Sequence, residues 1–149
     1  MTVTSKDAGY NALIKRAMGG KRSEITVGIH AKAGGEQHEG GKGVTILDVA
    51  QWLEFGTDVR PPLAFVRGWF DENKQRCNEM IAAMMQSVLA GKRTREQALQ
   101  LLGAKFAAEM QARMAAGIHV PDWHEVPGHT PGIDTGQTRS AITFEVKDK

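Results

Sequence analysis

The stretch VLAGKRTREQALQLL, residues 88–102, decides the fold, because it ends one long helix and begins another. Gly91 is a helix-ending residue, since glycine adopts the left-handed conformation that closes a helix without steric cost. Thr94 and Gln97 have the spacing of a capping box, in which two side chains satisfy backbone N–H groups at a helix start. A connection of about four residues between the helices predicts an antiparallel helical hairpin.

Apolar side chains recur at helical spacing on both sides of this connection. The pattern predicts one helix over 65–90 and a second over 95–116. The residues expected to face the core are Val66, Phe70, Cys77, Ile81, Met84 and Val88 in the first helix and Ala98, Leu102, Phe106 and Met110 in the second. These two stripes are the faces that the hairpin is expected to bury.

Two short segments near the ends of the chain alternate apolar and polar residues, as half-buried strands do. Ile25, Val27 and Ile29 form the alternation in the first segment, and residues 141–147 repeat it in the second. Two such strands are marginal alone, so we expect them to pair with each other. The sequence therefore predicts an α+β fold, in which a small antiparallel sheet of N- and C-terminal strands packs on the long helical hairpin. The sequence does not decide whether a further strand joins them. A sheet this small has a free edge with which a strand of a neighbouring subunit could pair.

Two shorter helices are expected before the hairpin. Residues 5–18 predict an amphipathic helix with one apolar side. Residues 45–55 predict another, which begins with a capping box between Thr45 and Asp48 and ends at Gly56.

Two segments are too rich in glycine, proline or histidine for regular structure. KAGGEQHEGGKG, which starts at residue 32, has no large apolar residue, so we expect a mobile loop over 31–43. Residues 117–133 are expected to form a second loop, rich in Pro, Gly and His. No repeat or boundary divides the chain, and its mass of 16.2 kDa suits a single domain over 1–149.

Composition excludes several classes of protein. The formal net charge of +2, from 19 basic and 17 acidic residues, is too even for a typical nucleic-acid-binding protein. The single cysteine, Cys77, excludes a disulfide framework and a cysteine-based metal site, and its helical position is typical of a small core residue. The N-terminus lacks the apolar region of a signal peptide, and no apolar run has membrane-spanning length. The chain is therefore expected to stay in a reducing cytoplasm.

The triplet Asp134-Thr135-Gly136 matches the sequence around the catalytic carboxylate of aspartic proteases. Such an enzyme brings two carboxylates together to share one proton, whereas this chain has one copy of the triplet and is mostly helical by prediction. Asp134 and Gln137 also have capping-box spacing, so Asp134 or Thr135 is predicted to cap a short helical turn before the last strand. We assign no catalytic residue.

Histidines recur every five residues in the second loop, as His119, His124 and His129. A flexible loop lacks the rigid spacing that transition-metal sites use, so surface histidines are the simpler interpretation. We assign no metal site and no cofactor. An enzyme that uses Asp134 with these histidines is the third functional hypothesis, after the two that are given below.

Basic residues form three pairs near the expected helix ends: Lys15-Arg16, Lys21-Arg22 and Lys92-Arg93. Such pairs are usually solvated, and near a C-terminus they complement the helix dipole. They could also contact phosphates without reading the base sequence. We therefore keep a small DNA-binding or packaging accessory protein as the alternative to the function that the motifs described next imply.

Three motifs occur in a fixed order along the chain: VAQWLEFGT (49–57), RPPLAFVRGWFDENK (60–74) and IDTGQTRSAITFEV (133–146). This series resembles small tailed-bacteriophage proteins of the neck and tail-completion group. In that group a helix ends with Ala-x-x-x-Glu-Phe-Gly-Thr, a Pro-rich turn leads through Phe-x-Arg into a long helix, and the chain closes with Asp-Thr-Gly-x-x-Arg-x-x-Ile and a strand. Residues 91–114 resemble the group's second long helix, so the likeness spans about residues 24–147.

The resemblance implies a structural virion protein that is assembled in the bacterial host cytoplasm and is not an enzyme. It implies a tail-completion or neck component that forms a homo-oligomeric ring at the head–tail joint or tail end. The implied partners are other phage neck or tail proteins, with DNA close by in the channel and no membrane.

The resemblance also implies structural roles for the motif residues: Glu54, Phe55, Gly56, Pro61, Pro62, Phe65, Arg67, Asp134, Thr135, Gly136 and Arg139. Glu54 is expected to pair with Arg67 or Arg139 and so lock the turn beneath the helix end, while Gly56 lets the chain reverse. Three tryptophans are candidates for the core or for an interface, and for any single one the core is favoured: Trp52, Trp69 and Trp123.

Overall fold

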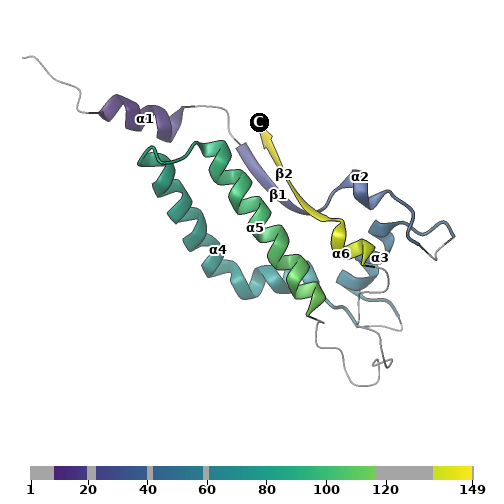
Figure 1. The fold of residues 1–149 in the computed structure, drawn as a ribbon. Helices are drawn as coiled ribbons and strands as arrows, with labels where there is room; N and C mark the ends of the chain where they lie inside the picture. The colour runs from purple at the N-terminus through teal and green to yellow at the C-terminus, as the bar shows by residue number, and fades with distance from the viewer. Residues whose placement is uncertain (1–8, 20–22, 40–41, 59–60, 117–135, 149) are drawn as a thin grey trace, which may run out of the picture.

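The computed structural model describes residues 9–19, 23–39, 42–58, 61–116 and 136–148. The elements, in chain order, are α1 (Tyr10–Met18), β1 (Ser23–Ile29), α2 (Ala31–Gly34), α3 (Ile46–Phe55), α4 (Phe65–Leu89), α5 (Arg95–Ala115), α6 (Gln137–Ser140) and β2 (Ile142–Asp148). The molecule is elongated: α1 and the α4–α5 connection lie at one end, and α2, α3 and α6 lie at the other (Figure 1). This architecture confirms the predicted α+β class, with a two-stranded sheet packed on a long helical hairpin.

α4 and α5 form the predicted antiparallel hairpin, and local capping explains where each helix ends. Gly91 adopts a φ of 72°, and the N–H of Lys92 donates to the carbonyl of Ser87 at 2.9 Å, which closes the last turn of α4. At the start of α5, the N–H of Gln97 donates to Thr94 Oγ1 at 3.1 Å and the N–H of Thr94 donates to Gln97 Oε1 at 3.0 Å. The capping box is thus confirmed.

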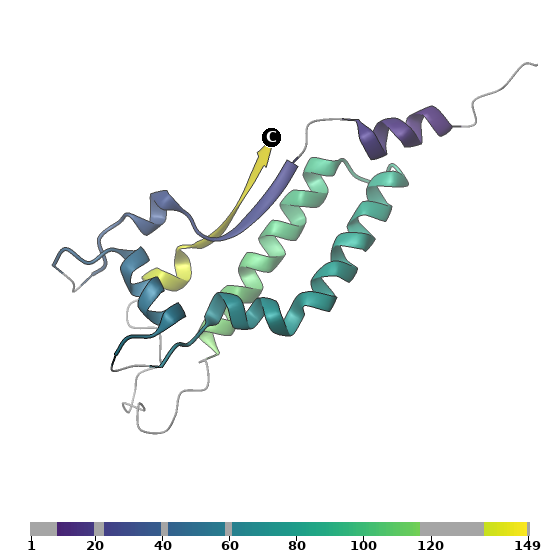
Figure 2. The same cartoon turned by 180° about the vertical axis from the view of Figure 1, so that it is seen from behind.

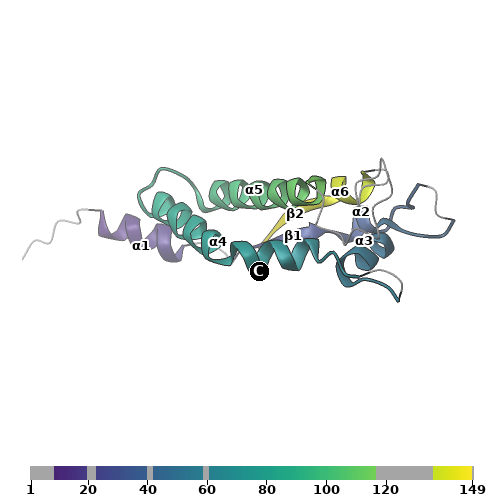
Figure 3. The ribbon, with the colours of Figure 1, turned by 90° about the horizontal axis from the view of Figure 1, so that it is seen from below.

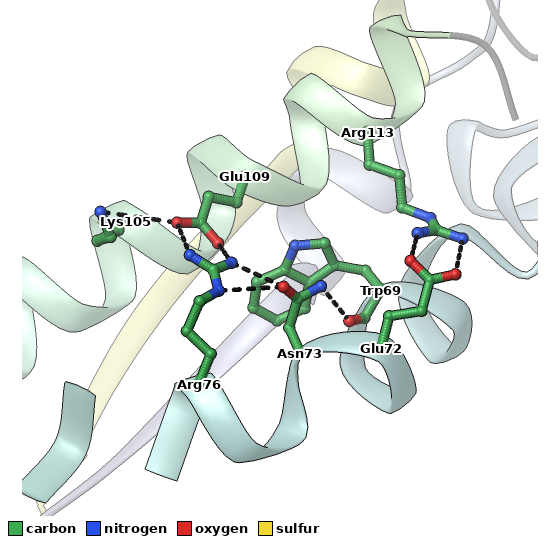
Figure 4. A network of polar contacts seen from close by, with 7 residues as sticks. All are labelled: Trp69, Glu72, Asn73, Arg76, Lys105, Glu109 and Arg113. Carbon is green, nitrogen blue, oxygen red and sulfur yellow. Dashed lines mark hydrogen bonds and ion pairs between the residues drawn. The ribbon is translucent and has the colours of Figure 1, made fainter. Parts of the chain in front are cut away.

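Polar side chains join the first half of α4 to the last half of α5 (Figure 4). Arg76 Nη1 donates to Glu109 Oε1 at 3.0 Å, and Arg113 Nη2 donates to Glu72 Oε1 at 2.9 Å. Both guanidinium groups bind their carboxylates through two nitrogens, and Asn73 Oδ1 accepts a further bond from Arg76. Exposed ion pairs contribute little energy, but this fork geometry fixes how the two helices cross.

β1 and β2 pair antiparallel and pack mainly on α5. Their register runs from Ser23 opposite Asp148 to Ile29 opposite Ile142. The ring of Phe144 lies so close to Gly103 that a Cβ added there would be 2.3 Å from a ring carbon. Glycine at this buried position of α5 therefore allows the sheet to approach the helix. Among the residues that the structure describes, the sheet has no third strand.

The core lies where α5, the first half of α4 and the beginning of β2 meet. Its largest fully buried side chains are Phe65, Met114 and Ile142. The ring of Trp69 is buried beside Phe106, with 5.6 Å between the ring centroids. Trp69 is therefore a core residue, which is the interpretation that the sequence favours for a single tryptophan.

Two helices begin at glycines rather than at side-chain caps. α1 begins directly after Gly9, which has a φ of 100°, and residues 5–8 of the helix predicted over 5–18 lie outside the described residues. α6 begins directly after Gly136, which has a φ of 76° and no side-chain cap. The predicted cap by Asp134 or Thr135 stays a prediction, because those two residues lie outside the described part.

Part of the segment predicted as a loop over 31–43 has regular structure. Residues 31–34 form α2, in which Gly34 is buried against Ile29 and Leu47. The chain then folds back on itself, because the N–H of His38 donates to the carbonyl of Val44 at 2.9 Å. Low hydrophobicity did not prevent order here, since backbone hydrogen bonds and one close glycine contact supply it. The second predicted loop, 117–133, lies outside the described residues.

Candidate assembly surfaces

Glu54 joins the end of α3 to the start of α4. Only 7% of this residue is exposed, and its carboxylate accepts the backbone N–H groups of Val66, at 2.9 Å, and Arg67, at 3.1 Å. Arg67 Nε donates to the same carboxylate at 2.8 Å, and Arg67 Nη2 donates to the carbonyl of Glu54 at 2.8 Å. The carboxylate therefore caps α4, where the positive end of the helix dipole favours a negative charge. The predicted pairing of Glu54 with Arg67 is confirmed.

The backbone between these two helices makes a tight reversal. Gly56 ends α3 with a φ of 79°, a conformation that suits glycine. The N–H of Leu63 donates to the carbonyl of Leu53 at 2.8 Å, so the connector returns to the helix it has left. Ala64, the N-cap of α4, has a φ of 48°, which is unusual for a residue with a side chain. Phe65 follows and is fully buried, so this residue belongs to the core.

The exposed side of α3 carries three large apolar side chains. Leu47 and Phe55 lie two turns apart on one side of the helix, and Trp52 lies next to Phe55. Trp52 is 49% exposed and Phe55 63%, although the guanidinium carbon of Arg67 lies 4.8 Å from the Phe55 ring centroid. Ile46 and Ala50 on the opposite side are buried, so α3 has apolar side chains on both sides, and on the exposed side they lie beside the polar Gln51.

A second apolar surface is a groove of about 460 Å³ between β1, α4 and α5. Its lining includes Val27 of β1, Phe70 and Ile81 of α4 and Leu102 of α5. Phe70 and Ile81 are exposed, which corrects the prediction that they belong to the buried stripe. The sheet covers mainly α5, and α4 bends along its length, so this part of α4 is left without a cover (Figures 2 and 3).

The groove has little of the chemistry that catalysis needs. Apart from the buried thiol of Cys77, the polar groups among its described lining residues are the indole N–H of Trp69, the amide of Asn78 and the guanidinium of Arg95. Burial raises the pKa of the Cys77 thiol, so the reactive thiolate is disfavoured. Apolar walls without converging polar groups suit a packing surface better than an active site.

The other sequence candidates are only partly placed by the structure. The loop histidines and Trp123 lie outside the described residues, and Arg139 is half-buried in α6. His30 Nδ1 lies 3.7 Å from Glu145 Oε1 at the end of the sheet. Within the described ranges, no group of three or more His, Cys, Asp or Glu side chains could hold a metal ion. None of the helices described is long and apolar enough to cross a membrane.

Basic residues that are distant in sequence meet at the end of the molecule that carries α1. Arg16 Nη1 donates to the carbonyl of Leu89 at 3.1 Å, and Arg95 Nη2 donates to the carbonyl of Ala17 at 3.0 Å. These bonds attach the last turn of α1 to the α4–α5 connection, which itself carries Lys92-Arg93. Sequence spacing contains no signal for this cluster, because it depends on where α1 packs.

No protein-family model, curated protein or solved structure matches this chain. Its function is therefore inferred from the surfaces described above and from the motifs of the sequence.

Proposed function

We propose that this chain is a structural virion protein of a tailed phage or prophage. It acts as a tail-completion or neck component and forms an oligomeric ring at the head–tail joint or tail end. The motif series of the sequence supports this function, and so do the two exposed apolar surfaces, on α3 and in the groove. Exposed apolar surfaces of this kind are typical of proteins that assemble with partners.

The observation that carries the proposal is the unit formed by Glu54 and Arg67. Residues 49–57 and 60–74, which resemble the neck and tail-completion group, meet through the buried carboxylate of Glu54. That carboxylate is occupied by two backbone N–H groups and a guanidinium, so it is committed to structure rather than to acid–base chemistry. Its role is to hold α3, and with it the exposed Trp52, in a fixed position relative to the hairpin.

Deletion of the gene from the encoding phage tests this function. We expect negative-stain electron microscopy of the lysate to show filled heads beside detached tails, or tails of irregular length. Wild-type protein supplied in trans should restore joined particles, whereas the Glu54→Gln variant, with its weakened turn, should restore fewer. Intact and infectious particles from the deletion strain would contradict the proposal.

The basic end supports a second candidate, a small DNA-binding or packaging accessory protein. Lys15, Arg16, Lys92, Arg93 and Arg95 lie together there, although the net charge of the chain is only +2. DNA affinity that depends on phosphate contacts falls steeply with salt, with a logarithmic slope of about −0.9 per contact. We would measure DNA affinity against salt concentration. A slope that is less steep in the Lys92→Gln/Arg93→Gln variant, and unchanged in a Lys42→Gln control, would favour this candidate.

A further inference from the structure

The molecule is elongated, with α1 at one end and α3 at the other (Figures 1 and 3). We call the end formed by α1 and the α4–α5 connection, residues 9–19 and 90–95, the basic end. We call the end that contains α2 and α3, residues 31–58, the α3 end. Each end has exposed apolar side chains, and the charges differ between them.

At the basic end, hydrogen bonds attach the C-terminal part of α1 to the hairpin. The hydrogen bonds of Arg16 and Arg95 hold its last turn, and the helix then extends away from the hairpin (Figure 1). Tyr10 is 70% exposed and Leu13 is 45% exposed. Both residues belong to the apolar side of an amphipathic helix, and that side is normally packed against something.

At the α3 end, a helix with apolar side chains on both sides has only one side covered. Ile46 and Ala50 face the core, whereas Leu47, Trp52 and Phe55 are exposed. Large apolar side chains that gather on an exposed surface are typical of a contact site. The Glu54–Arg67 contact and the capping box at Thr45 hold α3 rigidly, so its exposed side is already shaped for a partner.

Electrostatics decide which surfaces can meet. Residues 9–19 and 90–95 carry five cations and no acidic residue, a charge of +5 in a chain whose total is +2, and the nearest acid along the chain is Glu96, next to Arg95. The rest of the chain therefore carries −3. Residues 31–58 contribute five acidic and two basic side chains to it, and Arg67 and Arg139, which lie at the same end, offset two of the acids. Two basic ends would repel each other, whereas a basic end and an α3 end attract.

We propose that the basic end of one copy binds the α3 end of the next copy, with Tyr10 and Leu13 of one copy against Trp52 and Phe55 of the other. A contact between two different surfaces repeats from copy to copy, and it closes into a ring when the rotation between copies allows. This inference rests on the proposed function in one respect, namely that the chain assembles with copies of itself.

Disulfide trapping between single-cysteine additions tests the contact. Two variants of the full chain, Leu13→Cys and Trp52→Cys, are mixed at high concentration and oxidised gently. A third variant, Leu101→Cys, is the matched control, because Leu101 is an exposed apolar residue on α5 that belongs to neither end. Wild type is the blank, since its one cysteine, Cys77, is buried.

We expect the pair of residues 13 and 52 to give several times more cross-linked dimer than the pair of residues 13 and 101. We also expect it to exceed the dimer that either variant forms alone. Dominant 13–13 or 52–52 dimers would overturn the proposal, because they indicate contacts between like ends. Equal yields with the Leu101→Cys control would overturn it as well.

This experiment and the gene deletion can fail separately. If the deletion disrupts particles but the 13–52 cross-link does not form, the virion function stands and the end-to-end contact is wrong. If the cross-link forms but the deletion strain makes infectious particles, the contact stands and the virion function is wrong.

Discussion

The ring of Phe144 in β2 packs directly against the backbone of Gly103 in α5. A Cβ at residue 103 would lie within 3.0 Å of three ring carbons, and the ring is held from behind by its own strand. Glycine in a helix interior destabilises the helix by about 1 kcal/mol relative to alanine. Glycine at residue 103 nevertheless allows the sheet to approach the hairpin closely, because it leaves room for the Phe144 ring.

Gly103→Ala should therefore lower stability despite its better helix propensity. We expect the free energy of unfolding to fall by about 1–3 kcal/mol, as in other overpacked cores. Urea denaturation measures this change. Gly68→Ala in α4 is the matched control, because its added Cβ would meet only the flexible end of Arg113. If both variants changed the unfolding free energy by the same amount, the Phe144 ring would not be what limits the size of the side chain at residue 103.

Removal of either partner in the Glu54–Arg67 contact should destabilise the turn. We expect Glu54→Gln and Arg67→Gln each to cost about 1–3 kcal/mol of unfolding free energy, because hydrogen bonds to a charged group are lost. The double variant should lose less unfolding free energy than the sum of the two single losses, since the two side chains bind each other. Glu79→Gln, at an exposed position of α4, should change stability by less than about 0.5 kcal/mol. Additive losses would mean that the two residues act independently.

Ala64 should tolerate glycine better than any larger residue. Its φ of 48° lies in the left-handed region, which costs a residue with a Cβ about 1–2 kcal/mol. Ala64→Gly should thus raise the unfolding free energy, although the greater freedom of glycine in the unfolded chain offsets part of the gain. Ala64→Val should lower it. A less stable glycine variant, measured by thermal and urea unfolding, would contradict the backbone conformation described for this turn.

Acid should weaken the joint between α4 and α5. Hydrogen bonds from Arg76 hold the pKa of Glu109 below its ordinary value, and those from Arg113 do the same for Glu72. Since both pKa values are lower in the folded state, the stabilisation is complete above about pH 4.3, the usual pKa of glutamic acid, and is lost as the pH falls through the folded values. Urea midpoints followed from neutral to acid pH measure this. Glu109→Gln should make the fall of the urea midpoint with decreasing pH smaller than in wild type. Glu96→Gln, at an exposed position, should leave that fall unchanged.

Cys77 should react slowly with a thiol reagent at neutral pH. The residue is 5% exposed, and burial raises the pKa of its thiol, so little thiolate is present. The rate should rise greatly in urea, and it should already be high for the added thiol of Leu101→Cys in the native protein. A fast reaction of native wild type would mean that the groove opens to solvent down to Cys77.

The parts of the fold that the sequence predicts well are those set by local patterns. Both capping boxes, at Thr45 and Thr94, depend on residues three apart, and both appear in the structure. The helices of the hairpin and the two alternating strands follow from hydrophobic periodicity. The pairing of Glu54 with Arg67 follows only from the resemblance, because nothing local indicates that a carboxylate will cap a helix eleven residues further along the chain.

The features that the sequence did not predict depend on neighbours that are distant along the chain. Phe70 and Ile81 fit the apolar stripe of α4, but whether they are covered depends on how many strands lie over that part of the hairpin. α2 is too short to show a period. The basic end arises from the packing of α1, and a net charge of +2 conceals it.

The pairing of Ile29 with Ile142 makes the sheet dependent on the order of biosynthesis. β1 leaves the ribosome well before its only partner strand in the described structure, because that strand, β2, follows α5. At usual translation rates, an interval on the order of ten seconds separates the two. During that time Ile25, Val27 and Ile29 have no sheet to join, so a nascent chain should be most prone to chaperone capture or aggregation in this interval.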